Sequence, residues 1–163
     1  MISDLKTDSF DFYSFDIKNL EHQRALYKLE EDPQIRRWFG NFEEYFTDTS
    51  DVVDGLNNKF LVGKDDSIIG FVVLYDSFKF FNLDYGLLPE YRGIRLNSEQ
   101  TLGSKLLLET SETILRNNAE VEYLRCYIDL QNVRSISAAK RAGFIKYKEI
   151  IAGYGEYHKV REL

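Results

Sequence analysis

The sequence is poor in the residues that build disulfides, structural zinc sites and flexible linkers. Cys126 is the one cysteine among 163 residues, so no intramolecular disulfide can form and we expect a reducing compartment. The two histidines, His22 and His158, lie far apart in the sequence. One cysteine and two histidines do not suit a structural zinc site, so we expect no metal. Only two prolines occur, which argues against linkers and proline-rich recognition segments.

Long apolar runs and an excess of positive charge are also missing. The longest apolar run, residues 68–75, is far shorter than the roughly 20 residues of a membrane-spanning helix. The N-terminus carries acidic residues where a signal peptide has basic ones. With 21 Lys and Arg against 27 Asp and Glu, the formal net charge is −6, the opposite of a typical nucleic-acid binder. We therefore expect a cytoplasmic protein with no membrane or nucleic-acid partner.

The rest of the composition is that of one globular domain. Hydrophobic residues make up 44% and charged residues 29%, which is close to the average of folded soluble proteins and argues against disorder. A chain of 163 residues can bury a core without disulfides or a metal. We expect a single domain over residues 1–163.

Hydrophobic spacing and turn signals predict the order of the helices and strands. Asp32 followed by Pro33 is a strong helix start, and Gly40 ends that short helix. Ser50 is expected to cap another short helix that ends at Leu56. The other expected elements are a strand over 10–17, a helix over 19–31, a hairpin over 59–64 and 68–75, a strand over 80–88, a helix from 98 or 101 to 117, a strand over 123–128, a helix over 132–142, and strands over 145–151 and 157–163. This order predicts an α/β (α+β) domain with a mixed sheet and helices on its faces.

Two segments are basic although the whole chain is acidic. They contain Arg92, Arg95 and Lys105 around the start of the long helix, and Arg134, Lys140, Arg141, Lys146 and Lys148 after residue 132. Each segment places a helix N-terminus after a strand, where free backbone N–H groups and the helix dipole favour an anion. The segments therefore favour a phosphate-bearing ligand. The alternative is that the Lys and Arg side chains only form the solvent-exposed faces of their helices.

Four pieces of sequence, in the same order, resemble the GNAT N-acetyltransferase superfamily. Residues 85–93 (YGLLPEYRG) with 102–107 (LGSKLL) resemble its acetyl-CoA-binding motif, and residues 132–144 resemble its second cofactor motif. Residues 32–36 and the hairpin ending at 68–70 are similar to its ribosomal-protein-alanine acetyltransferase-like branch. The resemblance implies a mostly antiparallel central sheet of about seven strands with helices on both faces.

The resemblance also implies how acetyl-CoA, the co-substrate, is held. The pantetheine arm would pair with the backbone of Leu87, and the N–H of Tyr85 would polarise the thioester carbonyl. Asn132 and Ser135 would contact the pantetheine arm and its diphosphate. The loop and helix start that would wrap the diphosphate comprise Arg92, Gly93, Leu102, Gly103, Ser104 and Lys105.

The cofactor loop departs from the family pattern. The first and last residues of the motif are five positions apart in the family, whereas Arg92 and Gly103 are eleven apart, and the middle glycine is missing. About six residues are therefore inserted, which makes the loop longer than the usual glycine-rich turn. In an alternative register the motif starts at Gln100 and Gly103 is its middle glycine, but Lys105 then replaces the final small residue. Either the loop bulges outward and the helix start still caps the diphosphate, or the cofactor site is damaged.

The catalytic groups depart from the pattern as well. Ala139 stands where many members have a tyrosine that protonates the leaving thiolate. Because a thiol has a pKa of about 8.5, a thiolate is a tolerable leaving group without that acid. Tyr127, Tyr147 or a water held by Ser135 are the candidate substitutes. Asp84 is the candidate base for the amine proton; the alternatives are that Asp84 only faces solvent and that positioning of the amine suffices without a single base.

These observations predict an N-acetyltransferase in which the amine of a small molecule or peptide attacks the thioester directly in a ternary complex. Acidic residues over 43–54, close to the aromatic residues at 38–46, would favour a cationic amine if they border the acceptor site. Two other functions stay open: a catalytically silent GNAT-like module that binds acyl-CoA or a protein partner, and a regulatory or structural protein without a cofactor. The sequence fixes neither the acceptor nor the oligomeric state, for which a homodimer is one option.

Overall fold

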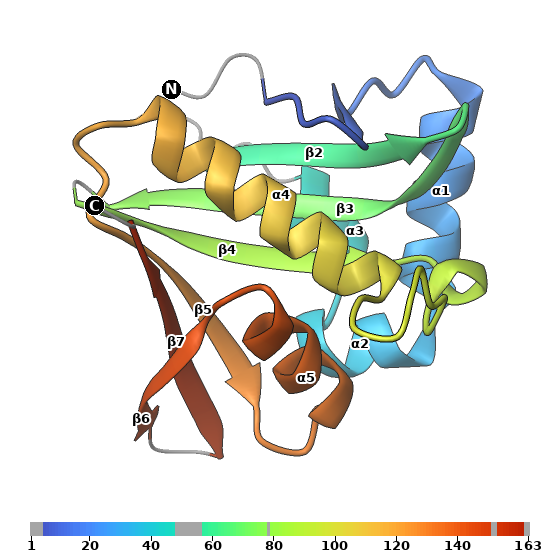
Figure 1. Cartoon of the computed structure of the whole chain (residues 1–163). Helices are drawn as coiled ribbons and strands as arrows, with labels where there is room; N and C mark the ends of the chain where they lie inside the picture. Colours follow the sequence, from blue (N-terminus) through green and yellow to red (C-terminus); the bar gives the residue numbers. More distant parts are fainter. Residues whose placement is uncertain (1–4, 48–56, 78, 151–152, 162–163) are drawn as a thin grey trace.

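The computed structural model describes residues 5–47, 57–77, 79–150 and 153–161, and Figure 1 shows the arrangement. The strands are β1 (Asp11–Ser14), β2 (Asn57–Lys64), β3 (Ser67–Ser77), β4 (Phe80–Leu87), β5 (Tyr123–Asp129), β6 (Ile145–Ile150) and β7 (Tyr154–Val160). The α-helices are α1 (Leu20–Glu31), α2 (Pro33–Phe39), α3 (Phe42–Thr47), α4 (Leu102–Asn117) and α5 (Val133–Arg141). None of the helices in the described ranges is long and apolar enough to span a membrane.

Over the described residues, the strands form one sheet of seven in the order β1-β2-β3-β4-β5-β7-β6. Every neighbouring pair is antiparallel except β4 and β5, which run parallel. The expected mixed, mostly antiparallel sheet of seven strands with helices on both faces is therefore confirmed.

Helices cover both faces of the sheet, and each face has its own hydrophobic core (Figure 1). On one face α4 and α5 pack against alternate strand residues such as Val72 and Leu74. On the other face α1, α2 and α3 pack against Phe71 and Val73. This division follows from the strand period, because successive side chains point to opposite faces.

The predicted helix starts correspond to side-chain caps. The Asp32 carboxylate accepts hydrogen bonds from the backbone N–H groups of Gln34 and Ile35, and Pro33 occupies the first position of α2. Thr101 caps α4 and Asn132 caps α5. Of the two starts that the sequence left open for the long helix, the structure has the one at Thr101.

Several expected boundaries were wrong. The first strand covers only Asp11–Ser14, and the last strand starts at Tyr154, three residues earlier than expected. Helix α3 was not predicted, because its six residues are too few to show a helical period. The helix expected between Ser50 and Leu56 lies outside the described residues.

The central strands β4 and β5 pair over a short length and then diverge (Figure 1). Their parallel pairing joins Phe80–Asn82 to Tyr123–Arg125 and stops there. Beyond this point β4 stays paired with β3 as far as Leu87, while β5 stays paired with β7 as far as Asp129. Among the described residues, one edge of β4 is therefore left without a partner strand in the middle of the sheet.

Candidate active site

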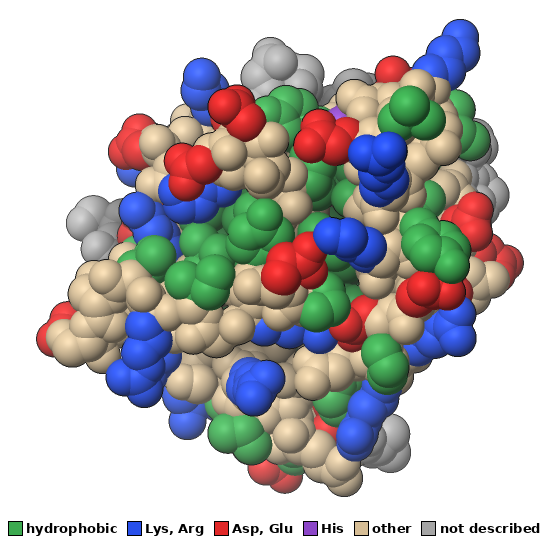
Figure 2. Space-filling model, turned by 90° about the vertical axis from the view of Figure 1, so that its right-hand side faces the viewer, with side chains coloured by type: hydrophobic (Ala, Val, Ile, Leu, Met, Phe, Trp, Pro, Cys, Tyr) green, Lys and Arg blue, Asp and Glu red, His purple; other side chains and the backbone are tan. Residues whose placement is uncertain are grey.

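A cavity of about 650 Å³ lies where β4 and β5 diverge. It is lined by residues of α2, α3, β4, β5 and α5, of the loop after β4 and of the first turn of α4. This volume is typical of small-molecule and cofactor sites. Figure 2 views the molecule from the side on which α1, α2 and the loop after β4 lie, and it shows a recess with basic side chains along its borders.

The free edge of β4 presents backbone donors to this cavity. The N–H of Leu88 donates to the carbonyl of Ile69 on β3 over 2.9 Å. Because successive N–H groups of a strand point to opposite sides, those of Tyr85 and Leu87 point away from β3. Both residues line the cavity, so their N–H groups occupy ladder positions that a partner strand would fill.

Arg92 is held by protein groups. Its Nη1 donates to both carboxylate oxygens of Asp32, at 3.1 and 3.0 Å, and to Oε1 of Gln34 at 3.1 Å. Its Nε donates to the carbonyl of Leu87 over 2.9 Å. Asp32 is buried, with 5% of its side chain exposed, and Arg92 retains 18%. The guanidinium that the resemblance placed on the diphosphate loop therefore ties that loop to the N-terminus of α2.

The inserted residues form a closed hairpin that projects outward. Arg95 and Thr101 form an antiparallel bridge, and the N–H of Leu102 donates to the carbonyl of Ile94 over 2.9 Å. At the tip, the side chain of Asn97 accepts hydrogen bonds from the backbone N–H groups of residues 99 and 100. Residues 94–99 of this hairpin are exposed, and α4 starts directly after it with Thr101 as its cap. That the start of α4 binds a diphosphate stays a prediction.

The structure brings together six of the nine predicted cofactor residues. Leu87, Arg92, Gly93, Gly103, Asn132 and Ser135 line the cavity. Leu102 and Ser104 are buried, and Lys105 pairs with Glu109 at 3.6 Å, so these three lie away from the cavity wall. The difference follows from helix geometry, because consecutive residues of the first turn of α4 point in different directions.

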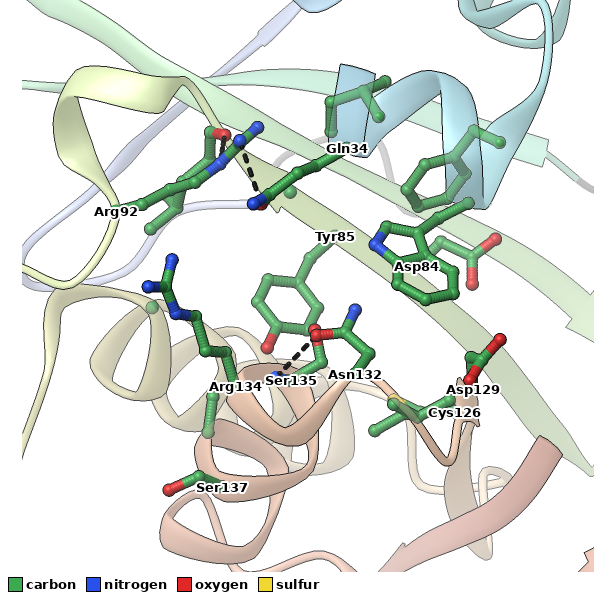
Figure 3. A pocket seen from close by; sticks show the side chains of 18 of the residues that line it. Gln34, Asp84, Tyr85, Arg92, Cys126, Asp129, Asn132, Arg134, Ser135 and Ser137 are labelled. Carbon is green, nitrogen blue, oxygen red and sulfur yellow. Dashed lines mark hydrogen bonds between the residues drawn. The ribbon is translucent and has the colours of Figure 1, made fainter. Parts of the chain in front are cut away.

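Asp84, the candidate base, lies at one end of the cavity. Its Oδ2 accepts a hydrogen bond from the hydroxyl of Tyr45 over 2.8 Å. Burial raises the pKa of the Asp84 carboxyl above its usual value, and the hydrogen bond from Tyr45 partly opposes that shift. Figure 3 shows Asp84 and Asp129 at this end and Arg92 and Arg134 at the other. The cavity is therefore acidic at one end and basic at the other.

The side chain of Tyr85 points to the opposite face of the sheet, toward α5. Burial raises the pKa of its phenol, and a hydrogen bond with the side chain of Ser135 lowers it in part. Ala139, the position of the missing family tyrosine, is fully buried in the core. Ser135 and Ala139 are four residues apart and share one helix face. Tyr85 therefore brings a phenol to the helix face from which the family tyrosine is missing.

The other candidates for the proton donor differ in position. Tyr127 lines the cavity, whereas Tyr147 stacks on His158 with ring centroids 4.5 Å apart and does not line it. Cys126 also lines the cavity, and burial together with the charge of Asp84 raises the pKa of its thiol, which keeps it protonated.

Sequence reasoning missed several residues of the cavity wall. Gln34 gave no signal of its own, and Thr101 was expected only as one of two possible helix starts. Arg95, Arg134 and Arg141 stood within the basic segments without being singled out. Their shared signal was positive charge close to helix starts in an acidic chain, and only the fold shows which cations of those segments face the cavity.

A family model described as an acetyltransferase (GNAT) domain matches residues 17–145. No curated protein sequence matches the chain at a significant level. Solved structures of the same fold include the N-acetyltransferase PseH of Campylobacter jejuni in complex with acetyl coenzyme A, at 16% identity over 94% of this chain and 99% of that one, with a TM-score of 0.66.

Two further structures are the aminoglycoside acetyltransferase AAC(6')-Ib in complex with coenzyme A and kanamycin, and the microcin C7 self-immunity acetyltransferase MccE in complex with acetyl-CoA and AMP. The first is 18% identical, with 94% of each chain covered and a TM-score of 0.69. The second is 16% identical, with 94% of this chain and 93% of that one covered and a TM-score of 0.69. None of these matches singles out the ribosomal-protein-alanine branch. Since the family model spans most of its length, the chain belongs to the GNAT acetyltransferase family.

Proposed function

We propose that the protein is an N-acetyltransferase that transfers the acetyl group of acetyl-CoA to a primary amine. The observation that carries the proposal is the free edge of β4, where the N–H groups of Tyr85 and Leu87 face a cavity with one basic and one acidic end. An extended amide chain such as pantetheine can pair with such an edge as an additional strand would.

The residues of the cavity fit acetyl-CoA as a co-substrate. The backbone of Leu87 would pair with the pantetheine arm, and Gly93, Gly103, Asn132 and Ser135 would line its path. The phosphate groups would lie at the basic end, and the acetyl group, which acetyl-CoA supplies in activated form, would lie toward Asp84. Because Arg92 occupies the carbonyl of Leu87, a pantetheine N–H that binds there has to share or displace the Nε of Arg92.

The residues of the site would divide the chemistry between them. The N–H of Tyr85 pairs with no strand in the described part of the chain, and it suits the oxygen of the thioester carbonyl as that oxygen gains negative charge. Asp84 would take the proton that the amine nitrogen loses as the C–N bond forms and the C–S bond breaks. The hydroxyl of Tyr85 would return a proton to the departing sulfur, so that the products are an amide and a free thiol.

The acidic end of the cavity suits an acceptor that arrives as an ammonium ion and loses its first proton to solvent, so that the neutral amine attacks the thioester. Asp84 and Asp129 supply negative charge there, and Trp38, Phe39 and Tyr45 supply aromatic faces that attract a cation. The acceptor would be the primary amine of a small molecule or a peptide. Because of the branch resemblance, the N-terminus of an alanine peptide belongs among the amines to be screened.

The test is release of free thiol from acetyl-CoA in the presence of a panel of primary amines, which includes aminoglycosides, polyamines and peptides. We expect one class of amine to give turnover that Asp84→Asn reduces by roughly 100-fold or more. Asp66→Asn, in the exposed turn between β2 and β3, is the matched control and should leave turnover unchanged. Failure of the wild-type protein to bind acetyl-CoA would contradict the proposal.

One observation favours a second candidate, a silent module that binds acyl-CoA. Ala139 leaves α5 without the usual proton donor, and the residue is buried in the core. Tight binding of acetyl-CoA with no turnover over the whole amine panel would support this candidate. The fold would then have kept the binding of acetyl-CoA without the catalytic activity.

A further inference from the structure

The backbone donors at the start of α4 are largely occupied by the protein itself. Thr101 and Ser104 form a capping box, in which the N–H of Ser104 donates to Oγ1 of Thr101 over 3.2 Å and the N–H of Thr101 donates to Oγ of Ser104 over 2.9 Å. The N–H of Leu102 is bonded to the carbonyl of Ile94, and that of Lys105 to the carbonyl of Thr101. Few donors are left for an anion.

Gly103 is the exception. Within the described ranges its N–H has no acceptor, and the residue lines the cavity. In the register that ends at Gly103, Thr101 stands at the position of the middle glycine of the family motif, so the cap comes with that substitution. A glycine there would have no side chain to cap the helix, and the N–H of Ser104 would be free for a ligand.

Three arginines at the same cavity have no such internal partners. Arg95 lies on the inserted hairpin, and Arg134 and Arg141 lie seven residues apart on one face of α5. All three are exposed and line the cavity, and none has a carboxylate partner in the described part of the chain. Arg92, by contrast, uses its Nη1 and Nε for Asp32, Gln34 and Leu87, and only its buried Nη2 has no hydrogen-bond partner among the described residues. Figure 3 shows Arg134 at the end of the cavity away from Asp84.

We propose that this protein holds the phosphate groups of coenzyme A mainly through the side chains of Arg95, Arg134 and Arg141, and not through the backbone amides of α4. This rests on the proposed function in taking coenzyme A as the ligand. A guanidinium binds two phosphate oxygens at once, so side chains can replace the amides that the capping box removes. The inserted hairpin then has a role, because it carries Arg95 to the cavity.

The first test is calorimetric titration of coenzyme A into the wild-type protein and into the variants Arg95→Gln, Arg134→Gln and Arg141→Gln. Replacing an arginine that contacts a phosphate should weaken coenzyme A binding about tenfold, and this loss of affinity should be smaller at high salt. Titration of dephospho-CoA, which lacks the 3′-phosphate, shows which phosphate each arginine binds. Replacing an arginine that binds the 3′-phosphate should weaken the binding of coenzyme A but not that of dephospho-CoA. Arg116→Gln, in the last turn of α4, is the matched control and should bind as the wild type does.

The second test uses Thr101→Gly, which restores the glycine of the family motif. It should free the N–H of Ser104, tighten coenzyme A binding, and reduce the penalty of Arg95→Gln when the two changes are combined. Glycine is itself a tolerable helix cap, so the fold should survive the change. A thermal melt checks that it does.

The outcomes separate the two proposals. If the wild type binds coenzyme A and all three arginine variants bind within twofold of it, the arginine assignment is overturned and the proposed function stands. Weaker binding by Thr101→Gly would also overturn the assignment, because it would show that the capped helix start is the better phosphate site. If the wild type does not bind coenzyme A, the proposed function fails as well.

Discussion

The ion pair between Asp32 and Arg92 should make a large contribution to the stability of the fold. Asp32→Ala removes the cap of α2, worth about 0.5–2 kcal/mol, and leaves Arg92 without its carboxylate, which costs about 3–5 kcal/mol for a buried pair. Because Arg92 keeps its bonds to Leu87 and Gln34, we expect a total of about 3–5 kcal/mol. Urea unfolding at constant m-value measures the loss in the free energy of unfolding.

Two variants show whether the pair, and not the cap, causes this loss. Asn19→Ala removes the cap of α1 without breaking an ion pair, so it should cost only about 1 kcal/mol. A double-mutant cycle of Asp32→Asn with Arg92→Gln should give a coupling free energy of about 1–3 kcal/mol. The reasoning is refuted if Asp32→Ala costs no more than Asn19→Ala, or if the two changes of the cycle are additive.

Three further predictions concern the site and the sheet. Asp84 must be deprotonated to act as a base, so kcat/KM should fall as the pH falls through the raised pKa of Asp84. Tyr45→Phe removes the hydrogen bond that lowers this pKa, so the acid limb of the pH profile should move to higher pH. An unmoved limb would exclude Asp84 as the base. Tyr85→Phe should lower kcat by roughly 100-fold while calorimetry finds acetyl-CoA affinity unchanged, and equal turnover would show that the phenol donates no proton. Gly70→Ala would press a methyl group onto the carbonyl oxygen of Gly86 on β4, so it should lower the free energy of unfolding, measured in urea, by about 1–3 kcal/mol. Gly103→Ala is the control: its methyl group would come no closer than an ordinary 3.4 Å, to the side chain of Leu87, and the free energy of unfolding should not fall.

Much of the fold could be predicted because its signals are local. Asp32 and Pro33 mark a helix start through the chemistry of a single turn, and the continuous apolar run of β3 indicates a strand that is buried on both faces. Helix α3 could not be predicted, because a helix of six residues is too short to show the helical spacing of apolar residues. Its aromatic residues would be equally compatible with a buried loop. The inserted hairpin was visible only as extra length, since a two-residue bridge leaves no pattern in the sequence.

Which residues line the cavity could be predicted where the lining depends on the backbone, and it was missed where the lining depends on side-chain partners. Strand alternation from Leu88 places the N–H groups of Tyr85 and Leu87 at the cavity as the resemblance implied. Arg92 was expected on the diphosphate loop, but its guanidinium faces Asp32, a partner 60 residues away along the chain. Which cation meets which acid depends on tertiary packing, and neither charge nor spacing determines it.

The pairing of coenzyme A with the free edge of β4 is tested most directly by amide hydrogen exchange on the two states of the protein. In the free protein the N–H groups of Tyr85 and Leu87 should exchange fast, because β5 has left this edge, while those of Asp84 and Gly86 are paired with β3 and should be protected. Saturation with coenzyme A should protect Tyr85 and Leu87 and leave Asp84 and Gly86 unchanged. Coenzyme A that binds without protecting Tyr85 and Leu87 would contradict the account, because the ligand would then lie elsewhere.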